Sequence, residues 1–142
     1  MGRFRTIALK CSRCNQGEAT LDTAAKPGMN ICIAADGKYD PGAGVASAEQ
    51  IQIVNEDNLV HAGGGTVDGT YAIADKASYL IPNIGDEVAL LVLDAEVCTI
   101  GALFKPNAAG KFVKTATAPA QFMCLETITV SGDQLVQMRR VR

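Results

Sequence analysis

The dipeptide Gly110-Lys111 is the first feature of this sequence that could do chemistry. It ends the small-residue stretch NAAGK at 107–111, and phosphate-binding loops also end in Gly-Lys. Such a loop needs a glycine, four residues, then Gly-Lys and a hydroxyl residue. Here the preceding glycine, Gly101, lies nine positions before Gly110, and Phe112 replaces the hydroxyl residue. We therefore interpret Gly110-Lys111 as a hairpin turn, not as a nucleotide site.

A second stretch of the chain repeats this pattern. The segments IAADGKYDP at 33–41 and PNAAGKFVK at 106–114 share the form Ala-x-Gly-Lys-aromatic after an apolar run. Glycine supplies the positive φ that tight hairpins need. Both segments are therefore predicted to be hairpins. We expect Lys111 to be a solvated tip and Phe112 to pack in the core.

The Cys-x-x-Cys pair formed by Cys11 and Cys14 could bind a metal or act in redox chemistry. Structural zinc sites use four ligands, usually as two close pairs. The sequence has no second such pair, and His61 is its only histidine. Cys11 and Cys14 are thus the only metal-ligand candidates, and we expect neither a metal nor a cofactor. The odd total of five cysteines favours buried thiols in a reducing compartment.

Residues suited to catalysis do not form a recognisable set. His61 adjoins a Gly-rich loop, and the sequence contains no Gly-x-Ser-x-Gly elbow. The acidic stretches 55–58 and 85–87 lack the spacing of an EF-hand loop and are interpreted as turns at strand ends. We therefore predict no catalytic residues and expect the chain not to be an enzyme.

Charge is distributed unevenly along the chain. Residues 1–17 hold four basic and no acidic residues, residues 134–142 hold three basic and no acidic residues, and the rest holds six basic and fifteen acidic residues. Basic ends on an acidic body could attract nucleic acid, or an acidic protein surface such as the body of a neighbouring copy, or could simply be solvated. The predicted partner-binding residues are Arg3, Phe4, Arg5, Arg139, Arg140 and Arg142.

The pattern of short segments predicts an all-β fold. They are rich in Val, Ile and Thr, are bounded by Gly, Pro, Asn or Asp, and recur about every ten residues. We expect a single β-barrel or jelly-roll-like domain at 18–142, preceded by an extended basic N-terminal arm at 1–17. The longest apolar run, 88–97, is interrupted by Asp94 and is too short to span a bilayer, so no membrane partner is expected.

The order of several segments resembles the small head decoration, or cement, proteins of tailed bacteriophages. These segments are TAAKPGMNICIAADGKYDP, YLIPNIGDEVALLVLD, TIGALFKPNAAGKFVKTATAPAQFMCLETIT and SGDQLVQMRRV. The resemblance covers roughly residues 20–142. It implies a non-enzymatic protein of the virion that binds the outer surface of the capsid and braces the major capsid protein lattice. It also implies a homo-oligomer, with a trimer favoured over a dimer, assembled in the cytoplasm of a bacterial host.

Three alternatives stay open. The chain could be another phage structural part, such as a tail or head-completion protein. It could be a small β-barrel that binds nucleic acid, although its seven aromatic residues are scattered and its body is acidic, so we expect no direct nucleic-acid partner. It could also be a small trimeric hydrolase of the dUTPase type, although the sequence lacks the metal-nucleotide and phosphate motifs of such enzymes.

Overall fold

The structure of the protein is a computed structural model that describes residues 7–11, 15–42, 44–45, 48–49, 51–56, 70–73, 76–116 and 121–142. The regular structure of these residues is all β. Within those ranges no helix is long and apolar enough to cross a membrane. The strands are β1 (Ala8–Lys10), β2 (Asn15–Thr20), β3 (Ile31–Ile33), β4 (Tyr39–Pro41), β5 (Gly44–Val45), β6 (Ala48–Glu49), β7 (Ile53–Val54), β8 (Lys76–Ile81), β9 (Glu87–Val92), β10 (Val97–Cys98), β11 (Leu103–Pro106), β12 (Phe112–Lys114), β13 (Phe122–Cys124), β14 (Ile128–Thr129) and β15 (Gln134–Arg140).

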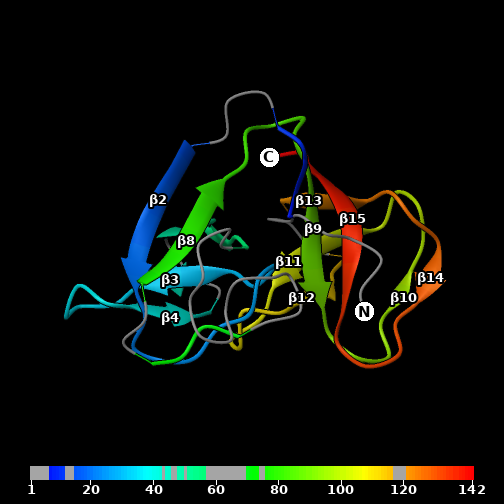
Figure 1. Ribbon diagram of the computed structural model, residues 1–142. Coiled ribbons are helices and arrows are strands. Elements are labelled where there is room, and N and C mark those ends of the chain that lie inside the picture. The colour runs from blue at the N-terminus through cyan, green and yellow to red at the C-terminus, as the bar shows by residue number, and fades with distance from the viewer. Residues whose placement is uncertain are drawn as a thin grey trace.

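Five strands close into a barrel in the order β9-β12-β11-β13-β15, and β15 pairs back to β9. The longest pairing runs from Gln134↔Val92 to Arg139↔Glu87. Because β15 occupies one edge of β9 along its whole length, β1 and β12 share the other edge. There β1 pairs beside Val88 and β12 pairs at Val92. The predicted all-β barrel is therefore confirmed, and Figure 1 shows it on the right-hand side of the molecule.

The barrel is filled by aromatic and branched side chains. Phe104, Phe112 and Phe122 are fully buried, and the rings of Phe112 and Phe122 meet edge to face with centroids 5.4 Å apart. Burial of each such side chain stabilises the fold by about 1.5–3 kcal/mol. The expectation that Phe112 packs in the core is thus confirmed. Strand β9 is buried at every residue, as its unbroken apolar run after Glu87 indicates.

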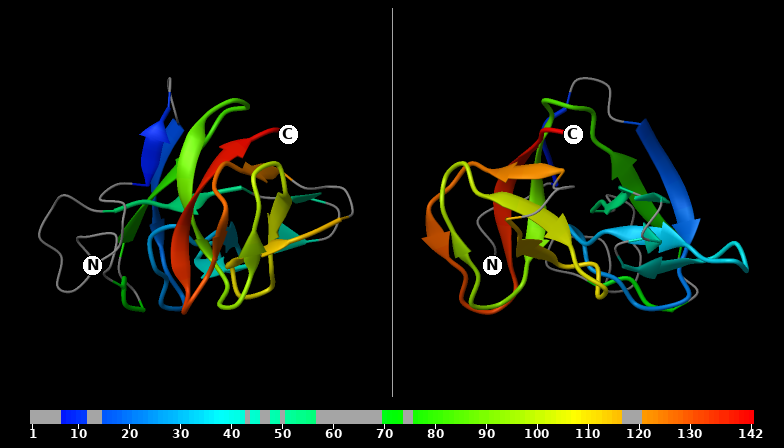
Figure 2. Two further views of the ribbon diagram at one scale, coloured as in Figure 1. Left: turned by 90° about the vertical axis from the view of Figure 1, so that its right-hand side faces the viewer. Right: turned by 180° about the vertical axis from the view of Figure 1, so that it is seen from behind.

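A second, smaller part packs beside the barrel. It contains the sheet β2-β8-β7 and the hairpin β3–β4, and it has its own apolar cluster around Leu21, Ile31 and Tyr71. Strand β8 serves both clusters, because Ala77 packs in the smaller one and Leu80 in the barrel cluster. Figure 2 shows from behind how the two parts lie side by side. The single barrel predicted for 18–142 therefore describes only part of the chain.

A fully buried asparagine joins the two parts. The backbone N–H of Asn30 donates to the carbonyl of Gly110 in the β11–β12 hairpin at 2.8 Å. Its side-chain Nδ2 donates to the carbonyl of Gly42 at 2.8 Å, and its Oδ1 accepts from the N–H of Gln52 at 3.0 Å. Gly42 follows β4 and Gln52 precedes β7. The Asn30 side chain therefore provides hydrogen-bond partners for the carbonyl of Gly42 and the N–H of Gln52, which lie just outside strands β4 and β7.

Both Gly-Lys segments are hairpins, as the sequence predicts. Strands β3 and β4 pair antiparallel around Gly37, and β11 and β12 pair antiparallel around Gly110, with φ of 82° and 79°. The expectation for Lys111 was wrong. Its ammonium forms an ion pair with Asp133, in the turn before β15, and only 28% of the Lys111 side chain is exposed. The hairpin tip is held against the barrel end because its cation meets an acidic turn.

The described part of the predicted N-terminal arm belongs to the folded body. Ile7 is fully buried, and its carbonyl accepts a hydrogen bond from the N–H of Ala89 in β9 at 2.8 Å. Residues 8–10 form β1, and residues 15–17 begin β2, which pairs with β8 along its whole length. Apolar side chains in this segment favour packing over extension. Residues 1–6 and 12–14 lie outside the described residues.

Candidate basic interaction surface

Several predicted contact residues lie where the turn between β8 and β9 meets the end of β15. We call this region the basic pole and define it as Lys10, residues 82–87 and residues 139–142. Its elements come from three distant parts of the sequence. The register Lys10↔Glu87 brings the end of β1 to β9, and the register Arg139↔Glu87 brings the end of β15 to the same residue.

The turn at 83–86 presents an exposed isoleucine. The N–H of Asp86 donates to the carbonyl of Asn83 at 3.0 Å, and the N–H of Asn83 donates to Oδ2 of Asp86 at 2.8 Å. Asp86 is buried, so these bonds are shielded from water. Ile84 sits at the tip with 71% of its side chain exposed. The turn therefore holds an apolar side chain in solvent on a fixed support.

Arg140 ties this turn to the last strand. Its backbone N–H donates to the carbonyl of Asp86 at 2.9 Å, and its carbonyl accepts from the N–H of Gly85 at 2.7 Å. Its guanidinium donates to the carbonyls of Pro82 at 2.6 Å and Arg142 at 2.7 Å. Partial burial lowers the pKa of Arg140, and the group stays charged. Arg140 is therefore largely used to hold the fold.

Glu87 is the acidic centre of the basic pole. Its side chain is 8% exposed, and its Oε2 accepts from Nη2 of Arg139 at 3.1 Å and lies 3.8 Å from Nζ of Lys10. Its Oε1 accepts from Nε2 of Gln137 at 2.8 Å. The hydrogen bond from Arg139 is the main reason that the pKa of Glu87 lies below its ordinary value; burial opposes this, while Gln137 and Lys10 reinforce it.

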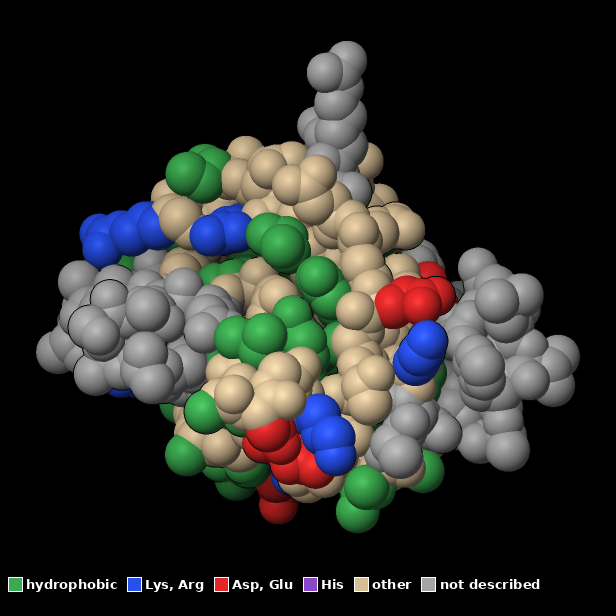
Figure 3. All heavy atoms as spheres, turned by 90° about the vertical axis from the view of Figure 1, so that its left-hand side faces the viewer, with side chains coloured by type: hydrophobic (Ala, Val, Ile, Leu, Met, Phe, Trp, Pro, Cys, Tyr) green, Lys and Arg blue, Asp and Glu red, His purple; other side chains and the backbone are tan. Residues whose placement is uncertain are grey.

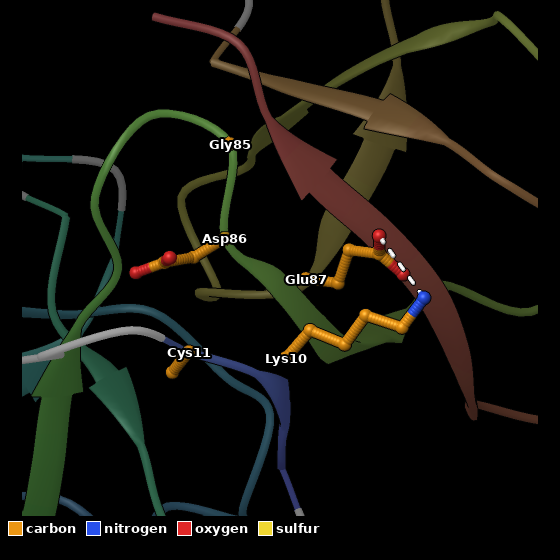
Figure 4. A pocket seen from close by; sticks show the side chains of 5 residues that line it. All are labelled: Lys10, Cys11, Gly85, Asp86 and Glu87. Carbon is orange, nitrogen blue, oxygen red and sulfur yellow. Dashed lines mark ion pairs between the residues drawn. The ribbon is translucent and has the colours of Figure 1, made fainter.

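A pocket of about 380 Å³ opens beside this ion pair. Figure 4 shows its lining: the chain of Lys10 reaches across to Glu87, and Asp86 and Cys11 lie on the other side. The lining cation is the end of Lys10, whose side chain is 75% exposed. The lining also holds the carboxylates of Asp86 and Glu87, so the exposed end of Lys10, and not the pocket itself, is the part that could meet an acidic group from solvent.

The basic pole has a surplus of positive charge. Four basic side chains, Lys10, Arg139, Arg140 and Arg142, meet only two acidic ones, Asp86 and Glu87, and both acids are buried. In the part of the chain that the structure describes, no group of three or more His, Cys, Asp or Glu residues could hold a metal. The arrangement is suited to binding anionic groups by charge and hydrogen bonding.

The six predicted contact residues have different outcomes. Arg3, Phe4 and Arg5 lie outside the described residues. Arg139 and Arg140 lie at the basic pole, but each makes contacts within the fold, and the Arg139 side chain is 43% exposed. Arg142 is exposed. The structure thus brings Arg139, Arg140 and Arg142 together, while their role in binding a partner stays a prediction.

Sequence reasoning missed Lys10 and Ile84 as surface residues of the same region. Lys10 belongs to the segment predicted as an N-terminal arm, and the sequence interpretation of the turn at 85–87 does not include Ile84. The Asn-Ile-Gly-Asp turn at 83–86 is the signal that could have identified Ile84, since an apolar residue before a turn glycine lies at the tip. Nothing in the local sequence places Lys10 beside residue 87.

The cysteines occupy different environments. Cys11 is disulfide-bonded, and Cys14 lies outside the described residues. Zinc binding needs thiolates, so the metal hypothesis for Cys11 and Cys14 concerns the reduced protein and stays a prediction. Cys32, Cys98 and Cys124 are thiols outside any disulfide. Cys98 and Cys124 are buried as the sequence suggests, whereas Cys32 is only half-buried. The disulfide at Cys11 does not fit the reducing compartment expected from the sequence. His61 also lies outside the described residues.

The smaller part of the molecule presents a mixed surface. Figure 3 views the face that carries the smaller part, where hydrophobic side chains gather between basic and acidic ones. Tyr39 and Tyr79 stack there with ring centroids 5.9 Å apart, against the smaller cluster. The Tyr79 ring also lies over Gly17 on the edge strand β2, where an added Cβ would come within 2.6 Å of it. These tyrosines therefore cover the sheet β2-β8-β7.

Comparison with known proteins identifies a solved structure of similar fold. No protein-family model matches the chain, and no curated protein matches it. A solved structure, the N base of head fiber protein gp8.5 of bacteriophage phi29, has a similar fold. The TM-score is 0.56 and the sequence identity is 11%, over 90% of this chain and 94% of that one. The likeness shows a shared fold that includes both parts of this chain.

Proposed function

We propose that the chain is a structural, non-enzymatic protein of a tailed-phage particle that attaches to the outer surface of the head. The observation that carries this proposal is the shared fold with a head fiber base, which spans nearly the whole of both chains. The segment order described above supports the same class of protein independently of that comparison.

Within this class we favour a decoration protein that stabilises the capsid lattice. Its contacts with the major capsid protein would include the basic pole and three residues of the N-terminal segment, the basic Arg3 and Arg5 and the apolar Phe4. We also favour a homo-oligomer, with a trimer before a dimer, because several copies make individually weak contacts persistent. The fold shared with the base of the phi29 head fiber favours a second candidate: the chain would then be the base of a head-attached fibre.

Co-sedimentation with purified heads of the phage that encodes this chain tests the proposal. Full-length protein should pellet with heads and stay soluble without them. A chain that lacks residues 1–6 is the proper control for the N-terminal segment, since Ile7 is buried and a longer deletion would remove part of the fold. If full-length protein does not bind heads but binds purified tails, the chain is a tail part and the proposal fails.

Added stability of the heads separates the two candidates. A decoration protein should raise the temperature at which heads release their DNA, because it braces neighbouring capsid subunits. The base of a fibre should bind heads without this effect. Analytical ultracentrifugation of the free protein measures the oligomeric state in the same samples.

A further inference from the structure

We infer that the basic pole is the face that docks on the head, and that its partner is an acidic protein surface with an apolar recess that receives Ile84. This inference rests on the proposed function and adds to it the orientation of the chain and the chemistry of the partner. Charge complementarity and a preformed apolar anchor are the two observations that carry it.

The first observation is the way Ile84 is supported. A single exposed isoleucine is ordinary on a protein surface. At this turn, however, Asp86 and Arg140 hold the backbone on both sides of Ile84 through buried hydrogen bonds. An anchor that is already rigid loses little conformational entropy when it enters a partner's recess.

The second observation is which cations remain available around this anchor. The guanidinium of Arg140 donates to the carbonyl of Pro82, and Arg139 is hydrogen-bonded to Glu87 at 3.1 Å. Lys10 forms a longer ion pair with Glu87, at 3.8 Å, and its side chain is 75% exposed. The ends of Lys10 and Arg142 extend into solvent at the same pole, and the side chain of Lys10 also borders the pocket. Two exposed cations beside an apolar tip match a surface whose carboxylates surround a small apolar recess.

A second turn of the same chain serves as an internal comparison. Residues 99–102, Thr-Ile-Gly-Ala, form a turn like residues 83–86: the N–H of Ala102 donates to the carbonyl of Thr99 at 2.9 Å. Ile100 is 66% exposed, close to the 71% of Ile84. The segment around Ile100 contains no basic residue from 94 to 104. The two isoleucines thus share turn geometry and exposure, whereas only Ile84 has several basic residues in its own surface region.

The experiment compares head binding by full-length variants that change one feature each. Ile84→Ser should weaken binding about tenfold, the loss typical of a truncated anchor, whereas Ile100→Ser should leave binding unchanged. Arg142→Glu should also weaken binding about tenfold, and that loss should shrink as salt rises from about 50 to about 500 mM. Lys105→Glu makes the same change of charge on an exposed residue of β11 and should have no effect.

The outcomes separate this inference from the proposed function. If the unaltered protein does not bind heads, the proposed function fails. If it binds, and the two pole variants bind as tightly as their controls, the function stands and the docking face lies elsewhere. If only Ile100→Ser weakens binding, the surface near β10 is the docking face and the inference is wrong. If the pole variants lose affinity for duplex DNA but not for heads, the partner is nucleic acid and the inference is wrong. Thermal unfolding of each variant checks that the fold is unchanged.

Discussion

The backbone N–H of Asn30 donates to the carbonyl of Gly110 at 2.8 Å, and this bond joins the smaller part of the molecule to the barrel. The approach is so close that a Cβ added to Gly110 would lie 2.5 Å from the carbonyl oxygen of Asn30. Gly110 therefore has two reasons to be glycine: its φ of 79° and the backbone that passes beside it. The Gly-Lys pair that resembles the end of a phosphate loop is a structural junction.

Replacing Gly110 by alanine should destabilise the protein more than the same change at Gly37. Both residues have φ near 80°, so alanine costs about 1–2 kcal/mol at either site. An added Cβ meets nothing within 4 Å at Gly37, whereas at Gly110 it also meets backbone. We expect Gly110→Ala to lower the free energy of unfolding, measured in urea, by about 2 kcal/mol more than Gly37→Ala does. Equal losses of stability in the two variants would show that the backbone around Gly110 can move to accommodate the added Cβ at no further cost.

Asn30→Ala should lower the free energy of unfolding by about 2–4 kcal/mol, because it leaves the N–H of Gln52 and the carbonyl of Gly42 without their buried partner. Asn107→Ala is the matched control. Like Asn30, Asn107 makes two side-chain hydrogen bonds to the backbone: its Oδ1 accepts from the N–H groups of Ala109 and Lys111. Asn107 lies in an exposed turn, where water can replace these bonds. Asn107→Ala should therefore lower the free energy of unfolding by about 1 kcal/mol or less. Urea unfolding compares the two variants, and similar losses of stability would contradict the role of the Asn30 side chain in satisfying the backbone of Gly42 and Gln52.

The local chemistry of turns made some of this fold predictable. The hairpins at Gly37 and Gly110 follow from glycine placement, and the all-β class follows from many short apolar segments between turn residues. The pairings that build the barrel are long-range. Strand β15 pairs with β9, which lies more than forty residues earlier in the sequence. The smaller part depends on hydrogen bonds from the Asn30 side chain to Gly42 and Gln52, which are far from Asn30 in the sequence. No pattern within a short window specifies such contacts.

The candidate site was predictable only as a charge pattern. A run of arginines at 139–142 is evident in the sequence, and it does lie at a basic surface. The sequence does not show that Glu87 pairs with Arg139 or that the Pro82 carbonyl binds Arg140, because both contacts join residues more than fifty positions apart. Those partners decide which charges remain for another molecule. The sequence predicts Arg142 as a contact residue, but only the structure distinguishes it from Arg139 and Arg140, which make contacts within the fold, and places Lys10 in the same region.

Acid should selectively remove the stabilisation that Glu87 provides. Its pKa in the folded protein is lowered, chiefly by the hydrogen bond from Arg139, relative to an unfolded value of about 4.3. A lowered carboxyl pKa stabilises the fold above the unfolded pKa, and this stabilisation is lost as pH falls through the folded pKa. Glu87→Gln should therefore have a lower free energy of unfolding than the unaltered protein at pH 7, and this difference in the free energy of unfolding should narrow near pH 3. Urea unfolding at both pH values measures it, and a gap that does not change with pH would contradict the ion-pair role.

The three thiols should differ sharply in reactivity. Burial, helped by the neighbouring Cys124, raises the pKa of Cys98 to about 12, and burial likewise raises the pKa of Cys124. Cys32 is only half-buried. Since the thiolate is the reactive form, iodoacetamide at pH 8 should label Cys32 in the native protein and spare Cys98 and Cys124. Peptide mass spectrometry identifies the sites, and labelling in about 6 M guanidinium chloride is the control in which all three should react. Native labelling of Cys98 at the rate of Cys32 would mean that the barrel opens around β10 far more readily than its buried contacts allow.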